Sequence, residues 1–170
     1  MPERFDLLIL PHLDAAYNLA RWLVGNPADA EDIVQEAFLR ALRFFDGFRG
    51  ADSRAWLLKI VRNTSYSWLR KNRPTQLTDE FDETIHSDEN ADESAEMKLL
   101  SRAESKRVIN ALEALPLTFR EILVLREIEG LSYKEISEVT GVAMGTVMSS
   151  LSRARHRLRG QLGTASGREA

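Results

Sequence analysis

The sequence predicts an all-α protein that consists of two small helical domains joined by a flexible acidic linker. Apolar residues recur at intervals of three and four positions toward both ends of the chain, which is typical of amphipathic helices. Between them, residues 74–97 contain nine acidic residues and no basic residue, a composition typical of a linker. The predicted division of the 170 residues is a first domain 1–73, a linker 74–97, a second domain 98–162 and a C-terminal tail 163–170.

The composition excludes several classes of protein. There is no cysteine, so the chain has no disulfide, thiolate metal site or cysteine nucleophile. The three histidines, His12, His86 and His156, lack the paired spacing of a zinc site. No apolar run approaches the roughly 20 residues that cross a bilayer, and the N-terminus lacks the features of a signal peptide. We therefore expect a cytoplasmic protein without metal, other cofactor or membrane insertion.

Three helices are predicted in the first domain. The first spans Leu13–Val24 and ends at Gly25-Asn26-Pro27. The second begins at Pro27 or Asp29, because proline and an acidic residue both suit the first turn of a helix. It is expected to turn inward Ile33, Val34, Ala37, Phe38, Ala41, Leu42 and Phe45. A loop over 46–53 separates it from a third helix that runs from about Arg54 to Lys71.

The third helix has an unusual charge pattern. Between Arg54 and Arg73 there are six basic residues and no acidic one, and Tyr66 and Trp68 are interleaved with them. Cations and flat aromatic faces suit the backbone and the unpaired bases of a nucleic acid. A solvated basic face over an ordinary helical core would produce the same pattern. This helix alone therefore leaves both interpretations open.

The second domain carries the pattern of a helix-turn-helix. After Val108, Leu112 and Leu115, a helix is expected to end at Gly130 and to bury Phe119, Ile122, Leu123, Leu125 and Ile128. Ser132 and Glu135 predict a capping box for a short helix over 133–140, and Gly141 suits a left-handed turn. A longer helix begins near residues 143–145 and buries Val147, Leu151, Ala154 and Leu158. Residues 139–168 contain five arginines and no acid, which favours DNA contact.

Five segments in this order carry a family resemblance: AEDIVQEAFLRAL, FRG, WLLKIVRNT, LPLTFREILVLREIEGLSYKEISEVTGV and GTVMSSLSRARHRL. With them the chain resembles bacterial RNA polymerase sigma factors of the extracytoplasmic-function (ECF) class of the sigma-70 family. The resemblance implies that the first domain is sigma region 2, a bundle of three to four helices, and that the second is the helix-turn-helix of region 4. It implies a non-enzymatic function, the promoter-specific initiation of transcription.

The resemblance also implies partners. These are core RNA polymerase (the clamp helices of the β′ subunit and the flap of the β subunit), promoter DNA and an anti-sigma factor. The acidic linker then either runs toward the polymerase cleft as a partial mimic of nucleic acid, or is a spacer that keeps the two domains off each other's DNA-binding faces.

Candidate site residues follow from the same resemblance. The core-polymerase interface is assigned to Asp32, Gln35, Glu36 and Arg40. Melting and capture of the −10 element are assigned to Arg54, Lys59, Arg62, Asn63, Arg70 and Lys71. Among these, Asn63 is the candidate for a base edge, because its amide both donates and accepts hydrogen bonds. Trp56 and Trp68 could stack on bases, although packing in the core is the better interpretation for both.

Recognition of the −35 element as duplex is assigned to the start of the last helix, at Met144, Thr146, Met148, Ser149, Ser150, Arg153 and Arg155. Members of the family often carry arginine at one or both of the positions that Met148 and Ser150 occupy here. The loss of these cations is expected to weaken phosphate or guanine contacts and to alter which −35 sequence is preferred.

Two other classes of function stay open at this point. One is a stand-alone helix-turn-helix regulator whose N-terminal helical domain senses a ligand or dimerises, but this leaves the basic aromatic helix unexplained. The other is an enzyme that uses the acid pairs Asp29/Asp32 and Glu31/Glu36. Those acids lie on the outer face of one amphipathic helix, and no nucleophile–base constellation or phosphate-binding glycine loop accompanies them.

Overall fold

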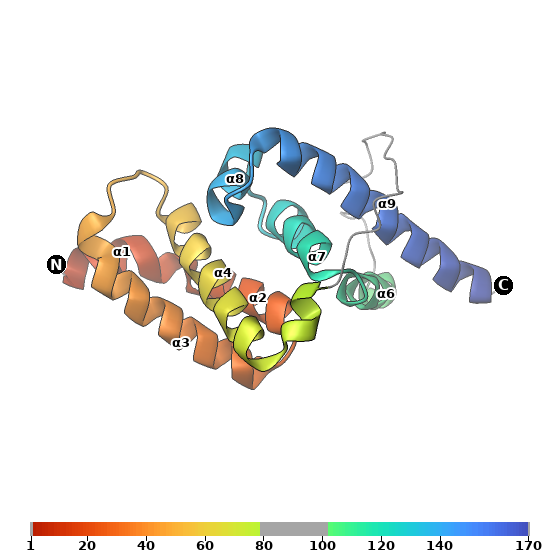
Figure 1. Cartoon of the computed structure of the whole chain (residues 1–170), viewed down its shortest axis with the longest axis horizontal. Helices are drawn as coiled ribbons and strands as arrows, with labels where there is room; N and C mark the ends of the chain where they lie inside the picture. Colours follow the sequence, from red (N-terminus) through yellow and green to blue (C-terminus); the bar gives the residue numbers. More distant parts are fainter. Residues whose placement is uncertain (1, 79–101, 170) are drawn as a thin grey trace.

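The protein folds into two helical lobes that lie side by side (Figure 1). The structure is a computed structural model that describes residues 2–78 and 102–169, and within these ranges it contains helices and turns but no strand. We refer to residues 2–78 as the N-lobe and to residues 102–169 as the C-lobe. The predicted all-α class is confirmed. Residues 79–97 of the predicted linker lie outside the described residues.

The N-lobe is built on three long helices that pack against one another. These are α2 (Leu13–Val24), α3 (Pro27–Phe44) and α4 (Ser53–Asn72). They are accompanied by α1 (Pro2–Ile9) and by three 3-10 turns, η1 (Leu10–His12), η2 (Phe45–Gly47) and η3 (Pro74–Thr78). The first five residues of the predicted linker thus form η3, which packs along α4.

Helix α3 begins at Pro27, one of the two starts predicted for it, and capping side chains set the first residues of α3 and α4. The Asn26 side chain accepts hydrogen bonds from the backbone N–H groups of Ala28 and Asp29, so α3 begins at Pro27. Asp52 caps α4 in the same way, with its Oδ1 2.9 Å from the N atom of Ala55. The Asp52 cap thus ends the loop 48–52 and begins α4.

Two features of the N-lobe differ from the prediction. Helix α1 was not predicted, yet it buries Phe5 and Ile9, and the ring of Phe5 meets that of Phe45 edge to face at 5.3 Å. Leu42 was predicted to face inward, but 54% of it is exposed. The buried stripe of α3 passes through Ala41 and ends at Phe45, and Leu42 is rotated about 100° from Ala41 around the helix axis.

The C-lobe comprises α6 (Arg102–Glu113), α7 (Leu117–Leu123), a π-helical turn η4 (Val124–Ile128), α8 (Tyr133–Thr140) and α9 (Met144–Glu169). Helices α6, α7 and α8 all pack against α9. Helix α9 continues through residues 163–169, which were predicted as a tail. Figure 1 shows α9 extending beyond the body of the lobe toward the C-terminus.

The predicted single helix over 119–128 is instead two segments. Glu129 donates from its backbone N–H to the carbonyl of Val124 at 2.9 Å, a five-residue step that widens the last turn. The wider turn rotates Ile128 out of the core, so Ile128 is exposed although it was predicted to be buried. Gly130, in a left-handed conformation with φ 72°, then ends the segment as predicted.

The helix-turn-helix of the C-lobe is confirmed. Ser132 accepts a hydrogen bond from the N–H of Glu135, whose carboxylate in turn accepts one from the N–H of Ser132, so the capping box of α8 is complete. Gly141 adopts φ 83° at the end of α8. Four residues of α9, Val147, Leu151, Ala154 and Leu158, are buried as predicted.

The left-handed turn gives a first prediction. Gly141→Ala is expected to lower the free energy of unfolding by about 1 kcal/mol, because an L-residue with a Cβ is strained in that conformation. Gly145→Ala is the matched control: Gly145 lies in the first turn of α9 with open space around it, so stability stays unchanged or rises. Urea unfolding followed by circular dichroism measures both. Equal effects at the two positions would contradict the turn argument.

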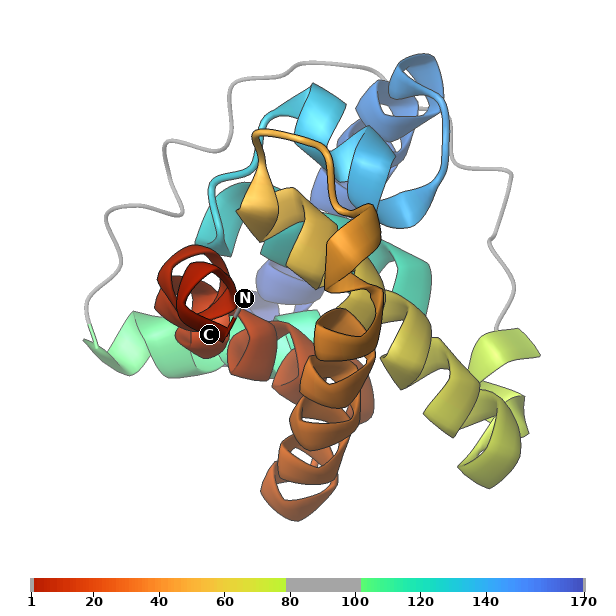
Figure 2. The ribbon, with the colours of Figure 1, turned by 90° about the vertical axis from the view of Figure 1, so that its left-hand side faces the viewer.

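The two lobes are in direct contact. Helix α4 packs along α8, and α2 approaches α7. The loop between α3 and α4 reaches the C-lobe beside α8 (Figure 2). The two lobes therefore cover part of each other's surface in this conformation, and the two roles predicted for the linker stay predictions.

Candidate nucleic-acid and polymerase interface

The predicted polymerase-binding residues lie on the outer face of α3. Asp32, Glu36 and Arg40 line a shallow groove between α3 and α4, while Gln35 is exposed beside it. Arg40 donates from Nε to Glu36 Oε2 at 3.0 Å and from Nη1 to Thr64 Oγ1 at 3.4 Å. The structure thus brings three of the four predicted residues into one groove.

Exposed apolar side chains continue this face of α3. Leu39, Leu42 and Phe44 are each more than half exposed. Leu39 lies three and four residues after Glu36 and Gln35, so it shares their face of the helix. These side chains were not among the predicted interface residues. Apolar groups rimmed by charges are the composition of a protein–protein interface. The available signal in the sequence was that these apolar residues lie outside the stripe of α3 that faces the core.

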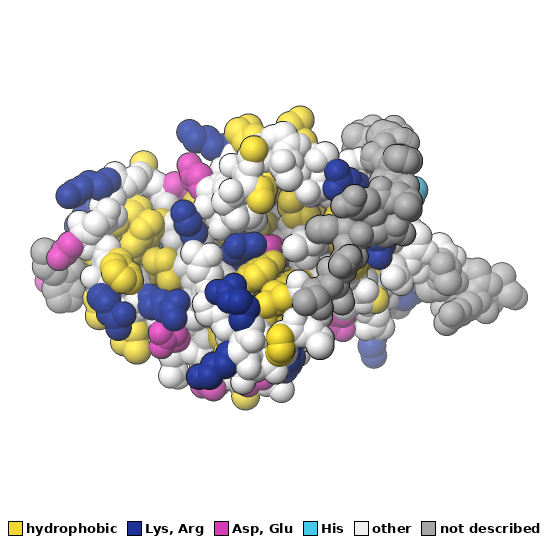
Figure 3. Space-filling model, in the orientation of Figure 1, with side chains coloured by type: hydrophobic (Ala, Val, Ile, Leu, Met, Phe, Trp, Pro, Cys, Tyr) yellow, Lys and Arg dark blue, Asp and Glu magenta, His cyan; other side chains and the backbone are white. Residues whose placement is uncertain are grey.

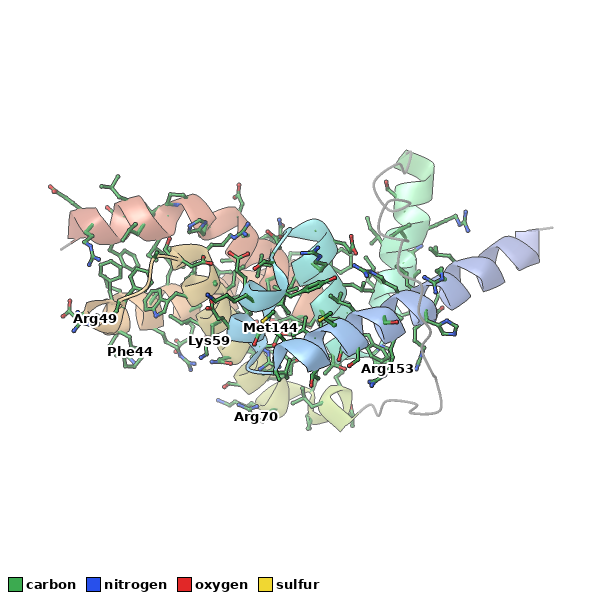
Figure 4. All side chains as sticks on the ribbon, turned by 90° about the horizontal axis from the view of Figure 1, so that it is seen from above. Phe44, Arg49, Lys59, Arg70, Met144 and Arg153 are labelled. Carbon is green, nitrogen blue, oxygen red and sulfur yellow. The ribbon has the colours of Figure 1, made fainter. Side chains whose placement is uncertain are left out.

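Four of the six residues predicted to hold the −10 strand are exposed on α4. They are Lys59, Asn63, Arg70 and Lys71. Figure 4 shows Lys59 and Arg70 on the side of the molecule that faces away from α1, together with Met144 and Arg153 of the C-lobe. In the space-filling view, Lys and Arg side chains lie over the N-lobe with hydrophobic side chains between them (Figure 3).

The two tryptophans of α4 pack against the N-lobe. The ring of Trp56 lies 4.9 Å from that of Phe48 and 6.1 Å from that of Phe45. Trp68 is half-buried, with the Arg73 guanidinium 5.0 Å from its ring. Packing is therefore the observed role of both side chains.

The other two residues of the predicted −10 set, Arg54 and Arg62, are turned toward the C-lobe. Arg54 donates to the Glu129 carbonyl at 3.2 Å and to Glu135 Oε1 at 3.3 Å. Arg62 donates from Nε to Glu121 Oε2 at 2.7 Å. The structure thus separates these two arginines from the four exposed residues.

A cleft of about 700 Å³ lies between the loop 47–52 and α8. It is lined by Phe48, Trp56 and Lys59 on one side and by Lys134, Glu135 and Glu138 on the other. The loop that precedes the basic helix α4 thus faces the C-lobe.

Two carboxyl groups meet at the edge of this cleft. The pKa of Asp52 is raised, first by a hydrogen bond shared with Glu135 and then by burial. The pKa of Glu135 is lowered to about 2 by the same hydrogen bond, by the N–H of Ser132 and by Arg54. Glu135 is therefore the ionised partner that faces Arg54. Nearby, burial and Arg54 lower the pKa of His12, whose Nε2 is 3.2 Å from Ser53 Oγ.

The start of α9 presents an uncharged surface. Met144, Thr146, Met148 and Ser149 are exposed, and Ser150 and Arg153 are half-buried. From Val139 to Ser152 the chain carries no charged residue. Most of the predicted −35 set therefore lies together on the first two turns of this helix.

Arg155 lies apart from that set. Its guanidinium donates to Glu127 Oε2 from Nε at 3.1 Å and from Nη2 at 2.7 Å. Arg155 and Glu127 are only 13% and 7% exposed. The pair connects α9 to the π-helical turn inside the C-lobe, so the structure gives Arg155 a place in packing and not on the exposed surface.

In the described part of the chain, no group of three or more His, Cys, Asp or Glu side chains is arranged to hold a metal ion. Among the described helices, none combines the length and the apolar character needed to span a membrane.

Fold and surface together define a class of protein: two helical lobes, one with a basic helix and a polar groove and the other a helix-turn-helix. Family comparison specifies the class further. Residues 8–75 match the model of sigma-70 region 2, and residues 105–158 match that of sigma-70 region 4. The chain therefore belongs to the sigma-70 family, among its ECF members.

Individual relatives agree with this assignment. The chain is 36% identical to the ECF RNA polymerase sigma factor SigE of Mycolicibacterium smegmatis, over all of this chain and 65% of the relative. It is 36% identical to the RNA polymerase sigma-H factor of Pseudomonas aeruginosa, over 89% of this chain and 82% of the relative. It is 33% identical to the ECF RNA polymerase sigma-E factor of Escherichia coli K12, over 90% and 83%.

Two solved structures have the same fold. The sigma factor RpoE of Bartonella quintana, in complex with the anti-sigma factor NepR, superposes with a TM-score of 0.68 at 29% identity and covers 95% of this chain and 96% of that one. CnrH, in complex with the cytosolic domain of CnrY, also gives 0.68, at 27% identity over 96% and 90%. The match to region 2 does not favour the stand-alone helix-turn-helix regulator.

Proposed function

We propose that this chain is an ECF sigma factor that binds core RNA polymerase and directs promoter-specific initiation in the cytoplasm. The observation that carries the proposal is the presence of both sigma regions in one chain, in the family's order. Residues 1–73 bind polymerase and melt the −10 element, residues 98–162 read the −35 element, and 74–97 connect them. The work is done by binding energy and DNA distortion, without covalent chemistry or a cofactor.

Each surface has a proposed partner. The α3 groove and the adjacent Leu39 and Leu42 dock on the β′ clamp helices, and the C-lobe docks on the β flap. The exposed cations of α4 hold the −10 strand, and the start of α9 enters the major groove at −35. An anti-sigma factor is a further proposed partner, because the relatives RpoE and CnrH were solved with NepR and CnrY.

Run-off transcription tests the function directly. Core polymerase, this protein and a library of genomic promoters are expected to yield transcripts from a subset of promoters that share −10 and −35 elements. Core polymerase alone is the control. Failure to form a complex with core polymerase, together with absence of initiation, would contradict the proposal.

Asn63→Ala is expected to reduce discrimination at one −10 base about tenfold and to change overall affinity little. Asn63 is exposed on α4, and a good pair of hydrogen bonds to a base edge contributes about 1–3 kcal/mol of discrimination. The measurement is binding of holoenzyme to promoters varied one base at a time. Lys59→Ala is the control. It is expected to weaken binding to all promoter sequences equally and to reduce the slope of log affinity against log salt concentration by about one. A uniform loss for Asn63→Ala would make this residue structural.

Met148 is proposed to contact a thymine methyl group at −35, because it is an exposed apolar side chain on an uncharged helix start. Replacing that thymine by uracil removes one methyl group and is expected to weaken binding roughly fourfold, in line with about 0.8 kcal/mol per buried carbon group. In Met148→Ala the uracil effect disappears, whereas in Ser149→Ala it persists. A uracil effect of equal size in Met148→Ala would exclude the contact.

A further inference from the structure

The basic helix α4 has a protein partner as well as its proposed DNA partner. Two of its cations, Arg54 and Arg62, are paired with acidic residues of the C-lobe, Glu135 and Glu121. Figure 1 shows α4 lying against the C-lobe, with α8 beside its first turns. The same arginines belong to the set predicted from the sequence to hold the −10 strand.

Glu121 is the central residue of this contact. It lies in α7 among apolar side chains and is 3% exposed. Its Oε2 accepts from Arg62 Nε at 2.7 Å, and its Oε1 accepts from the Tyr66 hydroxyl at 2.8 Å. Both oxygens of a buried carboxylate are thus satisfied, and both donors come from the other lobe.

The donors on α4 are arranged for an anion. The guanidinium of Arg62 lies 4.0 Å from the centre of the Tyr66 ring, which fixes its direction. Burial and the neighbouring Glu121 carboxylate raise the pKa of Tyr66, so its hydroxyl keeps the proton that it donates. A phosphate oxygen would accept the same two hydrogen bonds as the carboxylate of Glu121.

The contact between the lobes also covers the side of the loop 47–52 that faces α8. Residues of α8, among them Glu135 and Glu138, line the cleft that this loop forms with the C-lobe. A single strand that reached this loop and Arg62 together would have to displace α7 and α8. Closed lobes and a bound −10 strand therefore require the same space and the same donors.

We propose that Glu121, supported by Glu135, is an intramolecular competitor of promoter DNA that holds the lobes closed in the free protein. The proposal rests on the proposed sigma function. A partner that binds only the separated lobes, such as core polymerase, shifts the equilibrium toward the open form by its difference in affinity for the two forms. Closing thus keeps the loop 47–52 and the donors of Arg62 and Tyr66 from unproductive contact with nucleic acid until a partner separates the lobes.

Glu121 is a better target for mutation than Glu135. Glu135 also caps α8, so its loss would disturb the helix-turn-helix as well as the lobe contact. Glu121→Gln keeps the shape of the side chain and removes its charge. In the open form, water surrounds Arg62 in both the wild type and the variant. The substitution therefore raises the free energy of the closed form selectively, because only there does Arg62 lose its charged partner.

The experiment uses the full chain and exploits the absence of cysteine. Glu31→Cys on α3 and His156→Cys on α9, both exposed sites, receive a donor and an acceptor dye. Energy transfer is expected to fall in Glu121→Gln without DNA or polymerase present. Affinity for an oligonucleotide with the non-template −10 strand of a promoter that the protein uses is expected to rise roughly tenfold, which is about 1.4 kcal/mol. Asp6→Asn, which removes one exposed acid from α1, leaves both readouts unchanged.

A second variant keeps the test independent of folding in the C-lobe. Tyr66→Phe removes one hydrogen-bond donor to Glu121 from the N-lobe. It is expected to lower energy transfer by a smaller amount than Glu121→Gln does. Unchanged transfer in Tyr66→Phe and in folded Glu121→Gln would overturn the proposal. If energy transfer is unchanged but the wild-type protein initiates transcription, only the proposed competition by Glu121 is contradicted. If the wild-type protein does not initiate transcription, the proposed sigma function is contradicted, whatever the distance between the lobes.

Discussion

Reversal of two charges, Asp32→Lys with Glu36→Lys, is expected to abolish stable binding to core RNA polymerase. Both carboxylates line the groove between α3 and α4, and both are exposed. Like charges brought together across an interface cost several kcal/mol, so we expect at least a 100-fold loss of affinity. The reversal also breaks the exposed pair between Glu36 and Arg40, which contributes little to stability.

The measurement is co-purification with core polymerase, with circular dichroism to confirm that the N-lobe remains folded. The matched control is Asp6→Lys with Asp14→Lys, which reverses two exposed acids on α1 and α2 of the same lobe. This control changes the net charge by the same amount and is expected to retain binding. Retention of binding by the Asp32/Glu36 variant would remove the groove from the interface.

Arg155→Met is expected to lower the free energy of unfolding of the C-lobe by about 3 kcal/mol or more. The substitution keeps the apolar stem of the side chain but leaves the Glu127 carboxylate without its partner in a nearly buried position. Removal of one member of a buried ion pair typically costs about 3–5 kcal/mol. A small domain has a total stability of only about 5 kcal/mol or slightly more, so this change is expected to remove more than half of it and to raise the ratio of unfolded to folded lobe about 100-fold.

Two further variants identify the cause. Arg155→Met combined with Glu127→Leu replaces both charges by apolar groups and is expected to recover most of the stability. Arg153→Met, two residues earlier on the same helix, is expected to change stability by less than about 0.5 kcal/mol. Urea unfolding measures all three. A stable Arg155→Met protein that has lost −35 binding would instead restore the role predicted from the sequence.

Local chemistry made much of the fold predictable. The capping box at Ser132 and the left-handed turn at Gly141 depend on residues within a few positions of each helix end, and the structure places them as predicted. The buried stripe of α9 is likewise a periodic pattern of one helix. Helix ends and buried helix faces of this kind depend only on residues that are close together in the chain, so they can be predicted from a single sequence.

The site was less predictable because it depends on pairings between distant segments. The periodicity of α9 indicates where Arg155 points, but its partner Glu127 lies on another element and becomes close only after packing. The same holds for Arg62 and Glu121, 59 positions apart. A charge count of α4 therefore gives the sign of its surface and not which cations are free for a nucleic acid.

The N-terminal helix and the π-helical turn were missed for a related reason. Helix α1 is short and its burial depends on the aromatic rings of α3 and η2. The widened turn at η4 is set by one backbone hydrogen bond and has no strong side-chain signature. As a result, the burial of Phe5 and Ile9 in α1 and the exposure of Ile128 at the widened turn were both missed.

Glu135 performs two tasks with one carboxylate, as part of the capping box of α8 and as the partner of Arg54. Genetic screens for hyperactive alleles should accordingly recover changes at Glu121 far more often than at Glu135. Alleles at Glu135 would be pleiotropic, because any gain from freeing Arg54 comes with a weakened promoter-reading module.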